Sequence, residues 1–232
     1  MRSLLKRGRE WVASARRPRG VRMGELSGTA PLDPDFGYGR GTPIDRYYIE
    51  SFLGRSSPDI RGRALEVGDA TYCRRFGMGI ARQDVLHVAA GNQDATIVGD
   101  LSQPGLLPTD AFDCMVLTQT LHLIYDMPGA VREIHNALRP GGVALVTVPG
   151  ITRIDRGEWE NIWYWSLTGR SARRLFADAF GEDSCTIEIH GNVYAATCFL
   201  QGIALEEADT AKLDVRDPSF PVIITVRAVK ST

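Results

Sequence analysis

Two histidines follow predicted strands and are the first candidates for chemistry in this sequence. His122 comes after the apolar run 114–118, and His190 ends the apolar run 186–190. An imidazole can accept or donate a proton near neutral pH. Open parallel sheets bind ligands outside the carboxyl ends of their strands. We therefore expect His122 and His190 to be catalytic residues. The alternative for His122 is packing and contact with a cofactor, and the alternative for His190 is an ordinary strand-end histidine.

A second set of candidates lies at the ends of two other predicted strands, 64–67 and 95–98, and directly after 114–118. Gly68 follows the apolar strand 64–67, and without a Cβ its backbone can approach a ligand closely. The candidates for binding a cofactor in these turns are Glu66, Gly68, Asp69, Ala70, Asp100, Leu101, Gln119 and Thr120. A carboxylate that caps a nearby turn is the alternative for Glu66, and a plain turn aspartate is the alternative for Asp100.

Aromatic and basic residues supply the remaining candidates. Segment 155–165 is the densest aromatic stretch, and Trp163 and Tyr164 within it can wall a substrate pocket or pack a lid helix. Arg46 and Tyr47 stand in a predicted helix before the sheet. An arginine there can bind a substrate phosphate through two hydrogen bonds, whereas helix packing and solvated charge are the alternative.

The elements that must position these residues alternate along the chain. Short apolar runs predict seven strands, and stripes of apolar residues at helical spacing separate several of them. The predicted strands are 64–67, 84–88, 95–98, 114–118, 143–148, 186–190 and 222–229. One helix stripe holds Val131, Ile134 and Leu138, another begins near Thr168 or Ser171, and a third runs from Val193 to Ile203. The order is typical of an α/β, Rossmann-like, doubly wound sheet.

Composition and charge place this sheet in one domain preceded by a basic arm. Residues 1–22 hold eight basic residues and one acid, so the rest of a chain with net charge −1 carries −8. The arm, with a Gly/Pro-rich linker, spans 1–42 and the sheet domain 43–232. The arm is a solvated tail or a surface for an anionic substrate or membrane. Near-neutral overall charge gives no reason to expect nucleic acid.

Further features bear on location and on metals. No apolar run is long enough to span a membrane or form a secretory signal, so a cytoplasmic protein is expected. The four cysteines have no C-x-x-C spacing, and we expect buried, reduced thiols. No cluster has metal-ligand spacing, so no metal is predicted. The sequence does not predict an oligomeric state.

The motifs together resemble the class I, S-adenosylmethionine-dependent methyltransferases of the broad type 11 kind, over roughly residues 43–232. The resemblance is carried by Glu66-Val67-Gly68-Asp69, Asp100-Leu101, Phe112-Asp113, Leu121-His122 and Leu138-Arg139-Pro140-Gly141-Gly142. It implies a last strand that runs antiparallel. It also implies that Glu66 and Gly68 contact the methionine moiety of the cofactor, that Asp100 and Leu101 flank its adenine, and that backbone near Gln119 completes the pocket. Tyr47 would belong to an N-terminal lid that reaches the cofactor.

The sequence departs from that family in two places. Only the first glycine of the usual G-x-G-x-G remains, at Gly68, and no acid ends the second strand for the ribose hydroxyls. Either Asn92 or a backbone group replaces that acid, or ribose binding is weaker. The G-x-G-x-x-G fingerprint of NAD enzymes is also absent, which counts against a nicotinamide-dependent oxidoreductase.

The resemblance predicts a methyltransferase that uses S-adenosylmethionine and acts on a small polar acceptor. Segments 39–53 and 199–207 look like a sugar-modifying subgroup, which favours a carbohydrate or glycoside hydroxyl. The basic residues leave a phosphorylated substrate possible as well. An amine acceptor is the alternative within the class, because a neutral nitrogen needs less help from a base. A degenerate protein that binds a cofactor or partner without turnover is the third possibility.

Overall fold

The computed structural model describes residues 22–231. The chain divides into two compact units, 1–31 and 32–232. In the described part of the first unit there is one short 3-10 turn, η1 (Gly24–Ser27). The predicted basic arm lies almost wholly in residues 1–21, outside the described residues, so its role stays a prediction. Among residues 22–231 no helix is long and apolar enough to cross a membrane.

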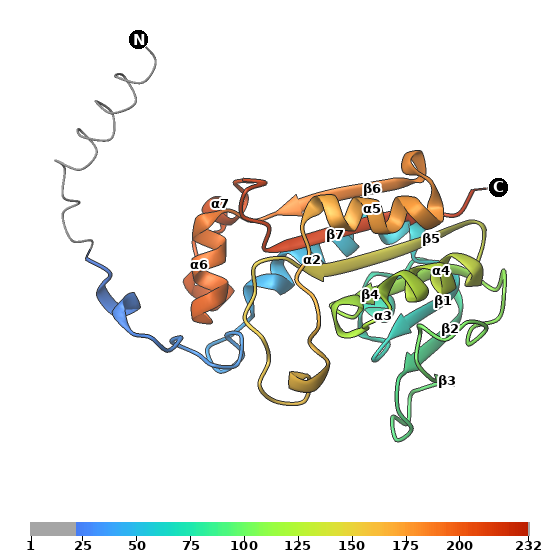
Figure 1. Ribbon diagram of the computed structural model, residues 1–232, viewed down its shortest axis with the longest axis horizontal. Coiled ribbons are helices and arrows are strands. Elements are labelled where there is room, and N and C mark those ends of the chain that lie inside the picture. Colours follow the sequence, from blue (N-terminus) through green and yellow to red (C-terminus); the bar gives the residue numbers. More distant parts are fainter. Residues whose placement is uncertain (1–21, 232) are drawn as a thin grey trace, which may run out of the picture. The chain divides into compact units, whose positions relative to one another are not determined.

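The second unit is built on a single seven-stranded sheet (Figure 1). Its strands lie in the order β3-β2-β1-β4-β5-β7-β6. They are β1 (Gly62–Val67), β2 (Ile80–His87), β3 (Ile97–Val98), β4 (Phe112–Thr118), β5 (Leu138–Pro149), β6 (Cys185–His190) and β7 (Ile223–Val229). Strands β1 to β5 pair in parallel, whereas β7 runs antiparallel to both β5 and β6. The predicted Rossmann-like fold with an antiparallel last strand is confirmed.

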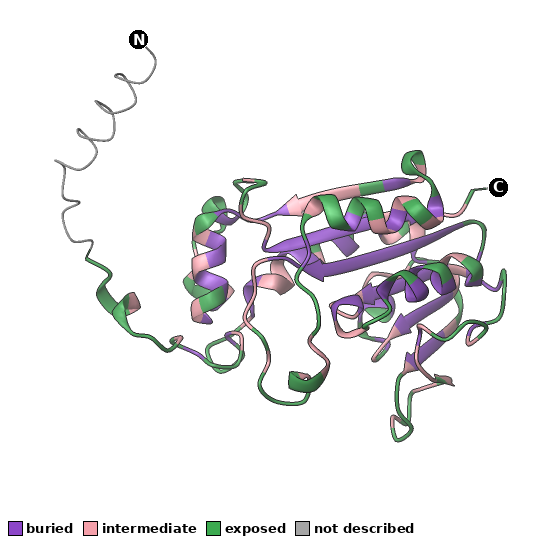
Figure 2. Ribbon diagram, viewed as in Figure 1, coloured by how far each residue is buried: buried purple, intermediate pink, exposed green. Residues whose placement is uncertain are grey.

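The central strands are buried on both faces because their side chains alternate between two hydrophobic layers (Figure 2). Leu65 and Met115 belong to one layer, and their neighbours Ala64 and Cys114 belong to the other. All four cysteines are free and buried, as expected. A sheet that is apolar on both faces needs helices on both faces.

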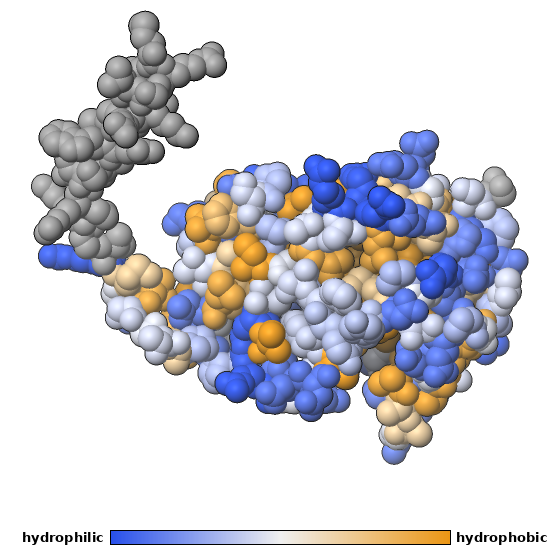
Figure 3. Space-filling model, viewed as in Figure 1, coloured by the Kyte–Doolittle hydropathy of each residue, from blue (hydrophilic) through white to orange (hydrophobic). Residues whose placement is uncertain are grey.

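Residues 22–231 form six α-helices, four of which supply that cover. The six are α2 (Ile44–Arg55), α3 (Thr71–Phe76), α4 (Met127–Ala137), α5 (Gly169–Phe180), α6 (Val193–Gln201) and α7 (Thr210–Leu213). Helices α4 and α5 pack on the first layer, whereas α2 and α3 pack on the second. Helices α6 and α7 form a smaller core with the first turn of α2. The outward side of α4 and α5 is largely polar (Figure 3).

Local sequence explains where two of these helices begin and end. Thr168 is the N-cap of α5, and its hydroxyl and that of Ser171 form a reciprocal capping box, so the first of the two predicted caps is confirmed. Asn192 caps α6 by accepting a hydrogen bond from the Ala195 amide. Gly202 ends α6 in the left-handed conformation at φ 66°. This helix therefore stops before Ile203, where the apolar stripe suggested it would end.

A further correction concerns Leu138. The sequence analysis placed it on a helix, but α4 ends at Ala137 and Leu138 is the first residue of β5, paired with Phe112 of β4. The register between β4 and β5 shifts after that pair. A Cβ on Gly142 would lie 2.9 Å from the Phe112 carbonyl oxygen, so glycine permits the close approach. Helical spacing continued by chance into the strand.

Residues 33–42 are fastened to the sheet domain, although they were predicted to be linker. Asp33 donates its amide to the Gln201 carbonyl at 3.1 Å. The Thr42 hydroxyl donates to Glu206 at 2.6 Å in η6 (Leu205–Glu207), and Thr42 accepts from the Leu205 amide at 2.7 Å. The composition indicated irregular backbone, but it did not indicate these contacts. A domain boundary at residue 42 stays a prediction.

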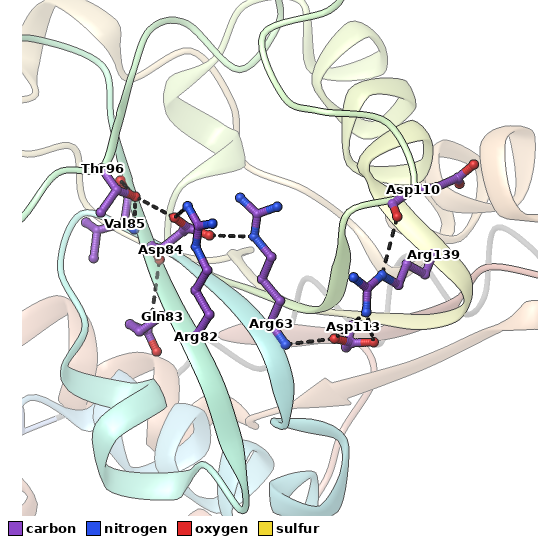
Figure 4. Close-up of polar contacts among 9 residues, drawn as sticks. All are labelled: Arg63, Arg82, Gln83, Asp84, Val85, Thr96, Asp110, Asp113 and Arg139. Carbon is purple, nitrogen blue, oxygen red and sulfur yellow. Dashed lines mark hydrogen bonds and ion pairs between the residues drawn. The ribbon is translucent and has the colours of Figure 1, made fainter.

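A buried carboxylate joins β1 to β2 (Figure 4). Asp84 is 1% exposed and accepts hydrogen bonds from Arg63 at 2.7 Å, Arg82 at 3.1 Å and the Thr96 hydroxyl at 3.0 Å. Burial raises the pKa of Asp84, but the three donors together hold it below the usual value of an aspartate. Its stabilising effect is present at neutral pH and is lost as the pH falls through that depressed pKa.

We expect Asp84→Ala to lower the free energy of unfolding at pH 7 by about 3 kcal/mol, because it leaves the buried donors of Arg63 without a partner. Urea denaturation followed by circular dichroism measures this change. Asp178→Ala is the matched control, since its pair with Arg174 is exposed, and it should change stability by less than about 0.5 kcal/mol. Equal losses in the two variants would contradict the role of Asp84.

Candidate functional site

A cavity of about 340 Å³ opens at the carboxyl ends of β1, β2 and β4. The chain leaves β1 towards β2 and β3 on one side and then returns to build β4 and β5 on the other. Such a switch point is where open α/β sheets bind ligands. The cavity is lined by Phe36, Tyr38, Asp45, Arg46, Val67, Gly68, Leu86, His87, Val88, Thr118, Gln119, Thr120, His122, Leu123, Ile124, Thr152, Trp159, Ile162, Trp163 and Phe199. Most of this lining is apolar or aromatic.

The turn at Gly68 forms one wall of the cavity. Gly68 has φ 96°, a conformation that residues with a side chain rarely adopt, and a Cβ there would meet no atom within 4 Å. The space in front of this backbone is therefore open to a ligand. The Asn92 side chain donates to the Gly68 carbonyl at 2.7 Å and thereby fixes the turn from the loop after β2.

Six of the residues predicted for the site line the cavity. They are Arg46, Gly68, Gln119, Thr120, His122 and Trp163. They come from α2, from the loops after β1 and β4, and from the loop that contains η4 (Glu160–Ile162). These six residues are far apart in the sequence, and the structure brings them together at one edge of the sheet.

The other predicted residues in the turns shape the loops around the cavity and do not line it. Glu66 is 2% exposed and accepts from the amides of Tyr72 and Cys73 at 3.0 and 2.8 Å, so its carboxylate caps α3. Asp69 accepts from the Thr71 amide at 2.7 Å, and Ala70 is the N-cap position of the same helix. Burial raises the pKa of Glu66, and the two amides lower it in part.

Asp100 and Leu101 likewise serve the loop after β3. The Asp100 carboxylate accepts from the amide and hydroxyl of Ser102 at 2.9 and 2.8 Å, which is the turn aspartate that the sequence left open. Leu101 is buried in the core beneath α4. Neither side chain reaches the cavity in this structure.

His190, Tyr47 and Tyr164 lie apart from the cavity. His190 is buried, its Nε2 lies 3.0 Å from the Thr225 hydroxyl, and its ring packs against Tyr48. The Tyr47 hydroxyl donates to Asp214 at 2.6 Å. Tyr164 is exposed and makes an edge contact with Tyr125. A position at a strand end was not enough to bring His190 to the site, because its ring turns into the core under α2.

His122 is the predicted base that reaches the cavity. Its side chain is 1% exposed and its ring meets Trp163 edge-on at a centroid distance of 4.4 Å. Its Nδ1 has no hydrogen-bond partner among the described residues. Burial lowers the pKa of His122 to about 3, so the imidazole is neutral at neutral pH. Such a ring can hydrogen-bond a ligand but is a weak base.

Sequence reasoning missed several lining residues, and two of them are Phe36 and Asp45. Phe36 stands in the Gly/Pro-rich segment, where composition predicted only a linker. It has φ 52°, and Gln119 has φ 48°. Two of the three described non-glycine residues with positive φ therefore line the cavity, which fits the tendency of strained backbone to lie at functional sites.

Asp45 and Arg46 bring opposite charges to the cavity from the first turn of α2. The Arg46 guanidinium donates to the hydroxyls of Tyr38, at 2.7 Å, and Tyr72, and it makes no ion pair with a carboxylate of residues 22–231. An adjoining surface hollow is lined by Arg46, Tyr72 and Asp69, which follows Gly68. Burial raises the pKa of Asp45, an effect that Arg46 reduces. Arg46 thus places a positive charge that has no ion-paired carboxylate beside the Gly68 turn.

The loop after β2 is the place where the sequence lacks an acid for the ribose hydroxyls of the cofactor. Both ends of the Asn92 side chain bond to the backbone, of Gly68 and Asp94, so Asn92 shapes the turn. At the end of β2 the cavity is lined by His87 and Val88, and no carboxylate from that loop joins them among the described residues.

Residues 22–231 contain no group of three or more His, Cys, Asp or Glu placed to hold a metal ion.

Comparison with known proteins gives one family and several similar structures. The family model described as "Methyltransferase domain" matches residues 35–181, which is more than half of the chain. No curated protein sequence matches the chain. The three solved structures described next share less than 25% identity with this chain, so they show the fold alone.

Three of these structures illustrate the likeness. A Mesorhizobium loti S-adenosylmethionine-dependent methyltransferase has TM-score 0.51 and 16% identity, covering 81% of this chain and 98% of its own. A Haloferax volcanii protein, solved with the methyltransferase activator Trm112, has TM-score 0.52 and 19% identity, covering 80% and 91%. Haemonchus contortus phosphoethanolamine N-methyltransferase 2, solved with S-adenosyl-L-methionine, has TM-score 0.52 and 16% identity, covering 80% and 53%.

We expect the buried histidines to make stability fall as the pH falls below about 6.5, the usual histidine pKa. Burial lowers the pKa of His122 to about 3 and that of His190 to about 4, so between those values and 6.5 the unfolded chain binds more protons than the folded one. In that range each histidine lowers the free energy of unfolding by about 1.4 kcal/mol for each pH unit that the pH falls.

Urea denaturation at pH 7, 6 and 5 measures this effect as the difference between wild type and His190→Gln. The variant should lose less stability than wild type by about 1.4 kcal/mol for each pH unit below 6.5. Parallel curves for the two proteins would show that His190 is protonated as easily in the folded state as in the unfolded one.

Proposed function

Since this chain belongs to the family of methyltransferase domains, we propose that it is a class I enzyme that transfers the methyl group of S-adenosylmethionine to a hydroxyl group of a small acceptor. A sugar or glycoside hydroxyl is the acceptor that the sequence favours. The observation that carries the proposal is the cavity at the switch point between β1 and β4, with open space in front of Gly68.

The residues around Gly68 fit the cofactor. When bound, S-adenosylmethionine supplies a methyl group on a positively charged sulfur, and after transfer S-adenosylhomocysteine remains. We assign the backbone of Gly68, Gln119 and Thr120 to the surface that holds it. Glu66 and Asp69 act on the cofactor indirectly, because they fix the turn and the start of α3. Asp100 and Leu101 do the same for the loop after β3.

Arg46 is assigned to the carboxylate of the cofactor's methionine part, although the sequence suggested a substrate phosphate. Tyr38 and Tyr72 hold its guanidinium next to the Gly68 turn, and Tyr72 lies in the helix that this turn begins. A guanidinium without a carboxylate partner can bind one with two hydrogen bonds. This position beside the Gly68 turn favours the cofactor, because Gly68 belongs to the surface assigned to the cofactor.

Proton transfer from an acceptor hydroxyl is assigned to Asp45. A base works best when its pKa lies near the working pH. Burial raises the pKa of Asp45 and lowers that of His122 to about 3, so the carboxylate is the stronger base of the two. His122 then orients the acceptor through its unpartnered Nδ1. His190 lies apart from the cavity, with its Nε2 3.0 Å from the Thr225 hydroxyl, and we assign it to the packing of α2 on β7.

We expect Gly68→Val to abolish binding of S-adenosylhomocysteine, because the new side chain would enter the cavity and strain the backbone. Isothermal titration calorimetry with S-adenosylmethionine, S-adenosylhomocysteine and NAD measures the binding. Gly141→Val is the matched control, since Gly141 also has positive φ and open space but lies near the start of β5 and does not line the cavity. Binding of NAD alone by the wild type would overturn the proposed function.

We expect Arg46→Met to weaken binding of S-adenosylhomocysteine by at least tenfold, or about 1.4 kcal/mol, while binding of 5′-methylthioadenosine stays unchanged. The second ligand keeps the nucleoside and sulfur but lacks the carboxylate, so the contrast isolates the proposed contact. Arg75→Met is the control, because Arg75 is exposed and pairs with Glu50. Equal weakening of both ligands would show that Arg46 does not bind the carboxylate.

A further inference from the structure

The cavity has a second half that the cofactor residues do not explain. Gly68 and the end of β2 form one side, and Phe36, Trp163 and Phe199 come from three distant segments to form the other. The Phe36 and Trp163 rings are nearly parallel, with centroids 6.1 Å apart, and Phe199 lies 6.0 Å from Phe36. Aromatic walls of this kind bind the flat, apolar face of a ring. Under the proposed function this half receives the acceptor.

Phe36 is held in this wall by a built turn. The Asp33 carboxylate accepts from the Asp35 amide at 2.6 Å and from the Gly37 amide at 3.4 Å, which supports the positive φ of Phe36 between them. The turn is pressed against the end of α6, where a Cβ on Gly202 would lie 2.4 Å from the Asp33 carbonyl oxygen. The strained backbone is therefore fixed from two sides, which is expected where a side chain has a ligand to meet.

Three buried polar atoms surround the aromatic wall without a hydrogen-bond partner. They are Nη1 of Arg153, Nε1 of Trp163 and Nδ1 of His122. Buried polar groups in proteins are almost always bonded, and an exception needs an explanation such as a ligand or water. The arginine and indole nitrogens are donors only. A molecule that satisfies them must bring hydrogen-bond acceptors.

Arg153 makes this requirement more specific because it carries a charge. Its Cζ lies 4.6 Å from the centroid of the Phe36 ring, and no carboxylate of residues 22–231 forms an ion pair with it. The nearby Asp155 carboxylate instead accepts from the Trp159 amide at 3.1 Å. A partly buried guanidinium that rests on an aromatic ring and lacks an anion is suited to bind a carboxylate or a phosphate.

We infer that the acceptor carries an anionic oxygen group, which Arg153 binds, next to a ring whose apolar face packs on Phe36 and Trp163. This inference rests on the proposed function and names the substrate class of the same site. Arg153 lies against the lining residue Phe36 and follows the lining residue Thr152. A cationic amine on the aromatic wall would be repelled by Arg153 and by Arg46, and repulsion between like charges is strong where polarity is low. A neutral sugar would leave the charge of Arg153 without a partner.

The test compares anionic probes with neutral ones of the same shape, on the wild-type protein saturated with S-adenosylhomocysteine. The pairs are benzoate with benzamide and glucuronate with glucose, and phenyl phosphate replaces the carboxylate by a phosphate. Ligand-observed NMR titration gives the dissociation constants. We expect at least one anionic probe to bind tenfold more tightly than its neutral partner, and the pairs distinguish an aromatic ring from a sugar and a carboxylate from a phosphate.

Variants then locate the contact. Arg153→Met should lower the preference for the anionic probe over its neutral partner by at least tenfold, and Arg153→Lys should keep part of that preference. Trp163→Phe keeps an aromatic ring in the wall but lacks the indole nitrogen, and it should weaken binding of the probes. Arg156→Met is the matched control, because Arg156 is in the same loop, is exposed and pairs with Glu160. Retained binding of S-adenosylhomocysteine shows that each variant is folded.

Three results would overturn the inference: equal binding of charged and neutral probes, an unchanged preference in Arg153→Met, or no binding of any anionic probe by a protein that binds S-adenosylhomocysteine. Failure of the wild type to bind S-adenosylhomocysteine would instead count against the proposed function. The two failures are therefore distinguishable.

Discussion

The buried carboxylate of Glu66 is the constraint on which the site depends. It accepts hydrogen bonds from the amides of Tyr72 and Cys73 and thereby fixes the start of α3 directly behind β1. The chain between them has to turn sharply, and Gly68 provides the turn with φ 96°. Asn92 holds the Gly68 carbonyl from the next loop. Without this cap the amides of a short helix would be left unbonded, and the wall of the cavity would have no fixed shape.

Much of the sheet could be predicted because its signal is local. Each central strand is an apolar run, and the side chains of β4 alternate between two buried layers. Residues 114–118 can therefore be predicted as a strand without reference to the rest of the chain. The error at Leu138 has the same origin, since helical spacing cannot distinguish the last turn of α4 from the first residue of β5. The antiparallel direction of the last strand, in contrast, came with the family resemblance.

The candidate site was predictable in its cofactor half and less so in its acceptor half. Gly68, Gln119 and Thr120 follow strands directly, so a rule about strand ends finds them. Phe36 reaches the cavity only because Asp33 and Gly202 dock two segments that are far apart in sequence. His190 obeys the strand-end rule but turns into the core, because nothing in the sequence specifies the direction in which the ring points.

The charges of the cavity connect the two halves. Arg46 in the lining and Arg153 on the Phe36 ring are positive, Asp45 in the lining is negative, and burial keeps His122 neutral. Under the proposed function the bound cofactor adds a positive sulfur between a carboxylate and an ammonium group, so the loaded site carries an excess of positive charge. An anionic acceptor reduces that excess, and its attraction to the sulfur is strengthened by the apolar walls of Phe36 and Trp163. The same walls exclude water from the cavity, and without water near the sulfur transfer to the acceptor is favoured over hydrolysis.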